Sequence, residues 1–351
     1  MTRAHVRRPA GGARSAGAPR VRAEGFTLVE LMVAMVLGLL VIGAVISVFL
    51  GTQSSSRTLD AMSRVQETGR LGLERVARDV REAGYRACRD GELRNLLDTT
   101  GLDYDPALHD VRLAFGNQPA AGDLADHVAG HTFRLQRMVR VDGGPYVADA
   151  ESTPAVDVSP TPPLDQGDIV VIADPEGRCE MFQNVPAQQG TLNRSPGQNV
   201  TPGNIGPAGQ VEYMEFDGPV ELLEVASVTY FVGESAHSDG VRALFRQVGD
   251  GPPREVVDGV YDMRVDFGRD VNGDLNVDAF AAADATTGWG EDEWRQVVAV
   301  RLHLLAYNGE EDRVLDEPRQ GLPFGGAVFD APDRRLYQVF TTTVAVRNRV
   351  P

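Results

Sequence analysis

Five side chains that carry oxygen ligands lie at every second position of one short segment of the chain. They are Asp270, Asn272, Asp274, Asn276 and Asp278. In calcium-binding loops, alternate residues of these types point inward at a hard cation, which prefers oxygen ligands. The segment is therefore a candidate calcium site.

The match to a calcium loop is partial. A loop of the EF-hand type has glycine at its sixth position and a bidentate acid at its twelfth, where this chain has Leu275 and Ala281. Asp284 or Glu291 would have to supply the missing acid. Because Asn-Gly-Asp is also a common turn sequence, a bare turn between two strands is the alternative, and the sequence leaves both interpretations open.

The remaining reactive residue types do not form a catalytic pattern. His127 and His131 have the i, i+4 spacing of a metal pair on a helix, but Gly130 lies between them and no glutamate is near. His303 stands in an apolar, β-branched segment. The sequence has neither a serine elbow nor a phosphate-binding glycine loop. We predict that the chain is not an enzyme and has no cofactor apart from possible calcium.

One long apolar run dominates the N-terminal region. It extends from Phe26 to Leu50, directly after Gly25, and its one charged residue is Glu30. As a helix it would be about 37 Å long, enough to cross a bilayer with some tilt. A carboxylate inside such a span is costly, so Glu30 needs a partner or a function.

Two simpler interpretations explain this run less well. A secretory signal peptide has a shorter apolar region followed by a small-residue cleavage site, for which Ala44–Ser47 is a weak candidate. A plain membrane anchor explains the length of the run. It explains neither Glu30 nor the junction between Gly25 and Phe26.

The segment Gly25-Phe26-Thr27-Leu28-Val29-Glu30 resembles the type III signal of type IV pilins and type II secretion pseudopilins. The resemblance implies that a prepilin peptidase cleaves after Gly25 and methylates the new N-terminal residue, Phe26. The leader, residues 1–25, is longer than the leaders of many pilins.

Burial of Glu30 among packed helices requires a counter-charge. The free amine of Phe26 on a neighbouring subunit would lie at about the same depth. Our hypothesis is that this pair sets the height at which each subunit enters a filament.

The charge distribution indicates how the chain is oriented in a membrane. The net charge is −16, although the leader carries six arginines against one glutamate. The positive-inside rule keeps the basic end in the cytoplasm and places the acidic body outside. We expect a single-pass protein of the bacterial inner membrane with a periplasmic domain. So acidic a domain is not expected to bind nucleic acid.

The two cysteines, Cys88 and Cys179, fall in the part assigned to the periplasm, where disulfides form. One bridge between them is the simplest pairing, and two buried free thiols are the alternative. Neither cysteine has the spacing of a zinc ligand.

The helix is expected to continue beyond the membrane span. Apolar or small residues recur in steps of three and four at Leu59, Met62, Val65, Gly69, Leu73, Val76, Val80 and Ala83. Charged residues, Asp79 among them, occupy the other faces, and Gly84 is a suitable C-cap. We predict one helix from Phe26 to about Ala83. A separate surface helix after a short anchor is the alternative.

The rest of the chain has the pattern of a β-rich domain. The expected strands are Thr132–Val141, Asp168–Ala173, Cys179–Gln183, Glu221–Val232, Val241–Val248, Val256–Phe267, Gln296–Ala306 and Tyr337–Arg347. Ser152–Pro163 has the composition of a linker and Gln188–Gly209 that of a loop. The predicted fold class is α+β and type IV pilin-like: a long N-terminal helix packed on an antiparallel sheet with long loops.

We therefore expect four parts. Residues 1–25 form the cleaved leader, 26–50 the transmembrane and filament-core helix, 51–84 its amphipathic half, and 85–351 the periplasmic β-rich domain.

Four further segments resemble the PilW-type minor pilins. They are Arg78–Cys88, Gly167–Phe182, Trp294–Ala306 and Arg334–Arg349. The resemblance implies a minor pilin that acts in type IV pilus assembly, in a complex that primes filament formation or sits at the tip. Its partners would be other minor pilins, the major pilin, the prepilin peptidase and the inner-membrane assembly platform. The alternatives are a type II secretion pseudopilin of the J kind and a pilus-tip adhesin or binding module.

Overall fold

The computed structural model describes residues 27–84, 88, 93–101, 103–104, 114–115, 118–119, 124, 126–150, 153–186, 192–196, 199–205, 212–249, 251–309, 314–346 and 348. The chain divides into two compact units, Met1–Ser55 and Ser56–Pro351. The long helix begins in the first unit and ends in the second.

The described helices are α1 (Leu28–Glu82), the short 3-10 helix η3 (Ala283–Thr286) and α3 (Glu291–Arg295). The strands are β1 (Leu93–Asn95), β2 (His127–Arg140), β3 (Tyr146–Ala150), β4 (Ala155–Ser159), β5 (Ile169–Ala173), β6 (Cys179–Gln183), β7 (Leu192–Asn193), β8 (Phe216–Glu234), β9 (Arg242–Val248), β10 (Arg254–Asp258), β11 (Val260–Arg269), β12 (Ala279–Ala282), β13 (Val297–Tyr307), β14 (Leu322–Phe324), β15 (Ala327–Phe329) and β16 (Tyr337–Ala345). This combination confirms the predicted α+β class, and the unbroken α1 confirms one long helix.

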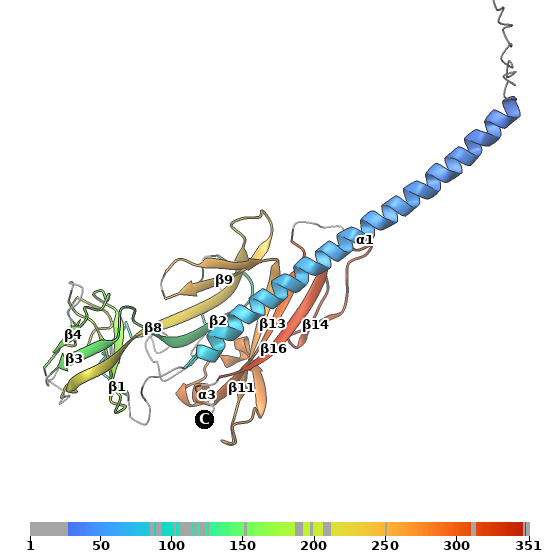
Figure 1. The fold of residues 1–351 in the computed structure, drawn as a ribbon. Helices are drawn as coiled ribbons and strands as arrows, with labels where there is room; N and C mark the ends of the chain where they lie inside the picture. The colour runs from blue at the N-terminus through green and yellow to red at the C-terminus, as the bar shows by residue number, and fades with distance from the viewer. Residues whose placement is uncertain are drawn as a thin grey trace, which may run out of the picture. The chain divides into compact units, whose positions relative to one another are not determined.

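Strand β8 organises the larger of the two main sheets. Its first part pairs with β3 and its middle with β5, while its last part pairs with β9 on one side and β2 on the other. Strands β6 and β1 extend the sheet beyond β5, and β4 and β7 extend it beyond β3. Figure 1 shows β8 running from the β3–β4 region towards β2 and β9. The second sheet is antiparallel, in the order β12-β11-β13-β16.

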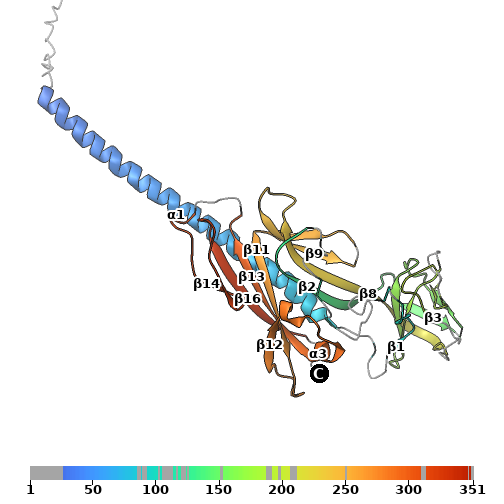
Figure 2. The same ribbon diagram turned by 180° about the vertical axis from the view of Figure 1, so that it is seen from behind.

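The part of α1 in the second unit packs on these sheets, as both ribbon views show (Figures 1 and 2). Its buried residues are Ala61, Val65, Thr68, Gly69, Gly72, Val76, Ala77, Asp79 and Val80. A Cβ on Gly69 would lie 2.3 Å from a ring carbon of Phe340, and one on Gly72 would lie 2.8 Å from a methyl carbon of Leu304. The close approach of helix to sheet therefore depends on these two glycines.

The predicted buried face of this helix needs correction at three positions. Leu59 and Met62 are 67% and 44% exposed, although their spacing predicts burial. Asp79, assigned to a polar face, is buried. The other predicted positions include Val65, Gly69, Val76, Val80 and Ala83, which are buried as their spacing predicts. The buried face also includes the small residues Ala61 and Gly72, which the predicted spacing does not select.

Two large hydrophobic cores contain most of the buried apolar residues of the second unit. One lies between α1 and both sheets and includes Val80, Phe133, Phe267 and Leu304. The other fills the region around β3 to β7 and includes Phe182. The linker predicted over Ser152–Pro163 is wrong, because β4 occupies Ala155–Ser159 and places Val156 in this second core. Prolines and serines flank this short strand, so the composition of the segment predicts a linker and not a strand.

Candidate functional site

The predicted processing site, Gly25 and Phe26, lies outside the described residues. The described chain starts with Thr27 and Glu30, which cap the helix reciprocally. The backbone N–H of Thr27 donates to Glu30 Oε2 (3.3 Å), and the N–H of Glu30 donates to Thr27 Oγ1 (3.3 Å). This is the capping box, whose Thr-x-x-Glu signature is present in the sequence but does not enter the prediction. Glu30 therefore has a local role in addition to any role between subunits.

The side chains from Leu28 to Leu50 form a long apolar surface, and none of them is buried. Among the described residues, α1 is the one helix long and apolar enough to cross a membrane. An apolar surface of this extent must be covered by lipid or by other helices. The structure thus supports membrane anchoring through the first half of α1.

Cys88 and Cys179 form a disulfide with 5.6 Å between their Cα atoms, as the sequence predicts. The bridge joins the segment after α1 to β6, in a small core that contains Leu97 and Leu223. It closes a loop of 91 residues. Loop-closure entropy gives such a bridge about 4–5 kcal/mol of stabilisation.

A buried carboxylate fixes α1 to the larger sheet. Asp79 Oδ2 accepts hydrogen bonds from the Tyr230 hydroxyl (2.6 Å) on β8 and from Arg246 Nε (2.7 Å) on β9. Arg137 Nη1 of β2 lies 3.6 Å from Asp79 Oδ1. Burial, followed by the neighbouring Asp79, raises the pKa of Tyr230 well above its usual value, so the hydroxyl remains a donor. The network sets the rotation of the helix on the sheet.

A second buried ion pair stabilises the region around β4 to β7. Glu180 and Arg194 pair with both side chains fully buried. Arg194 also donates to the carbonyl oxygens of Thr153 (2.5 Å) and Met214 (3.0 Å), and its guanidinium lies over the Tyr213 ring. One arginine therefore joins three loop segments, and sequence patterns give no signal for this role.

The candidate calcium segment forms a tight turn stabilised by its own side chains. Asp270 Oδ1 accepts from the N–H of Gly273 (2.7 Å), and its Oδ2 accepts from the N–H of Leu275 (2.8 Å). Burial alone would raise the pKa of Asp270, but these backbone hydrogen bonds outweigh it and lower the pKa. Leu275 has a φ of 67°, the left-handed conformation for which calcium loops use glycine.

The other predicted oxygen ligands contribute to the same turn. Asn272 Oδ1 and Asp274 Oδ1 accept from backbone N–H groups two residues ahead, and Asp278 accepts from Val271 and Asn272. Within the described part of the chain, no three His, Cys, Asp or Glu side chains are grouped so that they could hold a metal ion. Calcium binding by this segment stays a prediction.

The histidines singled out by the sequence have structural contacts. His127 and His131 lie on β2, not on a helix, so their i, i+4 spacing does not make a pair on one helical face. His131 Nδ1 bonds with the backbone of Val265, while His303 Nε2 is 3.1 Å from Asp266 Oδ2. These contacts join β2 to β11 and β11 to β13.

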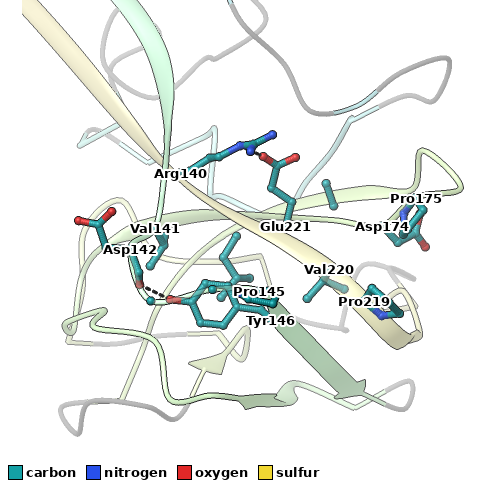
Figure 3. A pocket seen from close by; sticks show the side chains of 14 residues that line it. Arg140, Val141, Asp142, Pro145, Tyr146, Asp174, Pro175, Pro219, Val220 and Glu221 are labelled. Atoms are coloured by element: carbon teal, nitrogen blue, oxygen red, sulfur yellow. Dashed lines mark hydrogen bonds and ion pairs between the residues drawn. The ribbon is translucent and has the colours of Figure 1, made fainter.

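A cavity of about 680 Å³ is lined by the turn between β2 and β3, by the end of β5 and by the first part of β8 (Figure 3). Arg140 pairs with Glu221 at its rim, and the Tyr146 hydroxyl donates to the carbonyl oxygen of Asp142. Its volume suits a small ligand. Its lining contains no serine, cysteine or histidine that could act as a nucleophile.

Comparison with protein families gives two matches. The family Type IV Pilus-assembly protein W, PilW, matches residues 229–348, which include β9 to β16. The Prokaryotic N-terminal methylation motif matches residues 20–46. The resemblance to PilW-type minor pilins is confirmed. No curated protein and no solved structure matches the chain.

These matches fit the geometry. Together the two matches support a minor pilin related to type IV pili, and the PilW family is structural rather than catalytic. The methylation motif covers Gly25, Phe26 and Glu30, and the PilW match includes Tyr230 and Arg246, two of the residues that bind Asp79. The methylation motif and the apolar helix together support membrane anchoring and an association with the pilus.

Proposed function

We propose that this minor pilin joins other minor pilins in an inner-membrane complex that primes assembly of the type IV pilus, with its second unit in the periplasm. The observation that carries the proposal is the exposed apolar surface of Leu28–Leu50, whose single carboxylate, Glu30, lies near its N-terminal end. Similar helices from other pilins would cover that surface when the subunit leaves the lipid.

Glu30 would act in this step as the register charge. Its described hydrogen bonds go to Thr27 of the same helix and supply no positive charge. In a helix bundle, the ionised carboxylate would need a cation at its depth, and the methylated amine of Phe26 on a neighbour would provide one. A subunit inserted at another height would bury the charge without a partner.

Two variants separate the register charge from the helix cap. Glu30→Gln keeps a capping side chain at this position but removes the charge. Thr27→Ala removes the capping hydroxyl but keeps the charge. We expect Glu30→Gln to abolish incorporation into the minor-pilin complex and Thr27→Ala to retain most of it, measured by co-purification from membranes. Normal incorporation of Glu30→Gln would refute the register role.

Two further experiments test the assignment. Mass spectrometry of the mature chain should find an N-terminal, methylated Phe26, and an uncut leader would refute processing after Gly25. Deletion of the gene should remove surface pili if the protein primes assembly. Normal pili that have lost attachment would instead support the tip-binding alternative, for which the cavity beside Tyr146 is a candidate site.

A further inference from the structure

Three arginines line one pocket of about 580 Å³ in the second unit. Arg75 comes from α1, Arg246 from β9 and Arg254 from β10. The whole chain has a net charge of −16, so positive charge concentrated in one concave site runs against its composition. Such a site attracts anions from solution.

The two strand arginines face each other. Arg254 is the direct cross-strand partner of Arg246 in the antiparallel β9–β10 pair. Like charges in directly opposite positions destabilise a sheet. An anion bound between them would remove this repulsion.

The partners of Arg246 do not neutralise the cluster. Its Nε donates to Asp79, but Nη2 is buried and has no hydrogen-bond partner among the residues that the structure describes. Asp79 is also 3.6 Å from Arg137, which pairs with Glu82 as well, so Asp79 is the described acid that pairs with Arg246. One arginine in the pocket therefore keeps an unsatisfied donor.

Within the described ranges, Arg75 and Arg254 form no ion pair and no side-chain hydrogen bond. Glu255 also lines the pocket, but its carboxylate accepts hydrogen bonds from Ser235 Oγ (3.1 Å) and the N–H of Ala236 (3.0 Å) and lies 3.1 Å from His237 Nδ1. The described partners of the Glu255 carboxylate are thus Ser235, Ala236 and His237, and none of the three arginines is among them.

We propose that this pocket binds a small oxyanion with at least two negative charges, either a phosphate compound or a polycarboxylate. Guanidinium groups present paired N–H donors that match the oxygens of both classes. The volume lies in the range of sites for small organic ligands and exceeds what a single inorganic ion needs. This inference is independent of the role in filament assembly.

Isothermal titration calorimetry on the full-length chain in detergent tests the proposal, with pyrophosphate and citrate as probes and sodium chloride of matched ionic strength as the blank. We expect at least one probe to bind with a submillimolar Kd that weakens as salt increases. A response to pyrophosphate alone identifies the phosphate class, and a response to citrate alone identifies the polycarboxylate class. If neither probe binds the wild-type chain, the proposal is wrong.

The double variant Arg75→Gln/Arg254→Gln should weaken binding at least tenfold. Its unfolding midpoint without ligand should equal or exceed that of the wild type, because like-charge repulsion is relieved. Arg78→Gln is the matched control, since Arg78 is exposed on the same helix and does not line the pocket. Equal weakening by Arg78→Gln would show nonspecific charge attraction and overturn the proposal.

Discussion

Two carboxylates on the same helix have opposite environments. Glu30 is exposed, and its hydrogen bonds go to Thr27 within the first turn. Asp79 is 1% exposed and accepts hydrogen bonds from Tyr230 and Arg246, which lie on two strands. The chain supplies partners from two strands for Asp79, whereas the described partner of Glu30 is Thr27 of its own helix.

The apolar surfaces around these acids differ in the same way. Side chains from Leu28 to Leu50 are exposed, whereas Val65, Val76 and Val80 are fully buried against the sheets. One helix therefore combines a segment whose apolar surface requires lipid or other subunits with a segment whose cover is intramolecular. The second unit can therefore fold while the apolar surface of Leu28–Leu50 stays free for lipid or other helices, as the proposed role in assembly requires.

The largest expected effect comes from Asp79→Ala. Removal of this carboxylate leaves Arg246 and Tyr230 buried without their partner, which should lower the free energy of unfolding by about 3–5 kcal/mol. Urea unfolding of the full-length chain in detergent, followed by fluorescence of Trp289 and Trp294, measures it. Glu30→Ala should change this value by less than about 0.5 kcal/mol. Equal losses in the two variants would contradict the comparison.

A glycine pair tests the packing of the two helix segments. Gly69→Ala places a Cβ against the ring of Phe340 and should cost about 1–3 kcal/mol of unfolding free energy, since the ring or the helix must move. A Cβ on Gly43 meets nothing within 4 Å in the subunit, so Gly43→Ala should leave the same urea midpoint unchanged or slightly higher. A neutral Gly69→Ala would mean that the helix does not pack this closely.

The turn at Asp270–Asp278 provides a third set of carboxylates, whose described partners lie within the turn itself. If it binds calcium, a concentration ten times the Kd should stabilise the chain by about 1.4 kcal/mol, seen as a higher unfolding temperature. Asp274→Asn should remove the calcium-dependent shift, while Asp292→Asn, an exposed acid outside the turn, should retain it. No shift at millimolar calcium would favour the bare turn.

The smallest expected effect concerns Asp262, a half-buried residue whose Oδ1 is buried and has no hydrogen-bond partner among the described residues. Burial raises the pKa of Asp262 above its usual value, so its charged form destabilises the folded state. Asp262→Asn should therefore be more stable than the wild type at neutral pH. The difference should shrink as the pH falls through the raised pKa and disappear below the unfolded value. A difference that does not depend on pH would exclude this cause.

Local sequence patterns predict much of the fold. The long apolar run, the β-branched segments and the position of Gly84 at the helix end anticipate α1 and most of the long strands. The prediction of strands from composition and periodicity fails in two places. Ala155–Ser159 is a strand inside a proline- and serine-rich stretch, and β8 extends well beyond the predicted Glu221–Val232.

Some candidate sites can likewise be recognised from the sequence, and others cannot. The methylation signal and the two cysteines can be recognised from residue identity and spacing, because they depend on a short motif or on a compartment. Asp79, Arg194 and the arginine pocket cannot be recognised in this way. Their roles arise from residues far apart in the chain, as in the contact between Asp79 and Arg246.

The sequence alone is sufficient to establish a membrane-length helix, a methylation signal and a β-rich body, since each follows from local periodicity or a contiguous motif. Which charges are paired, why Asp79 is buried and where three arginines meet depend on how β8, β9 and β10 pack beside α1. Burial and pairing are properties of contacts between distant segments, so only the folded chain determines them.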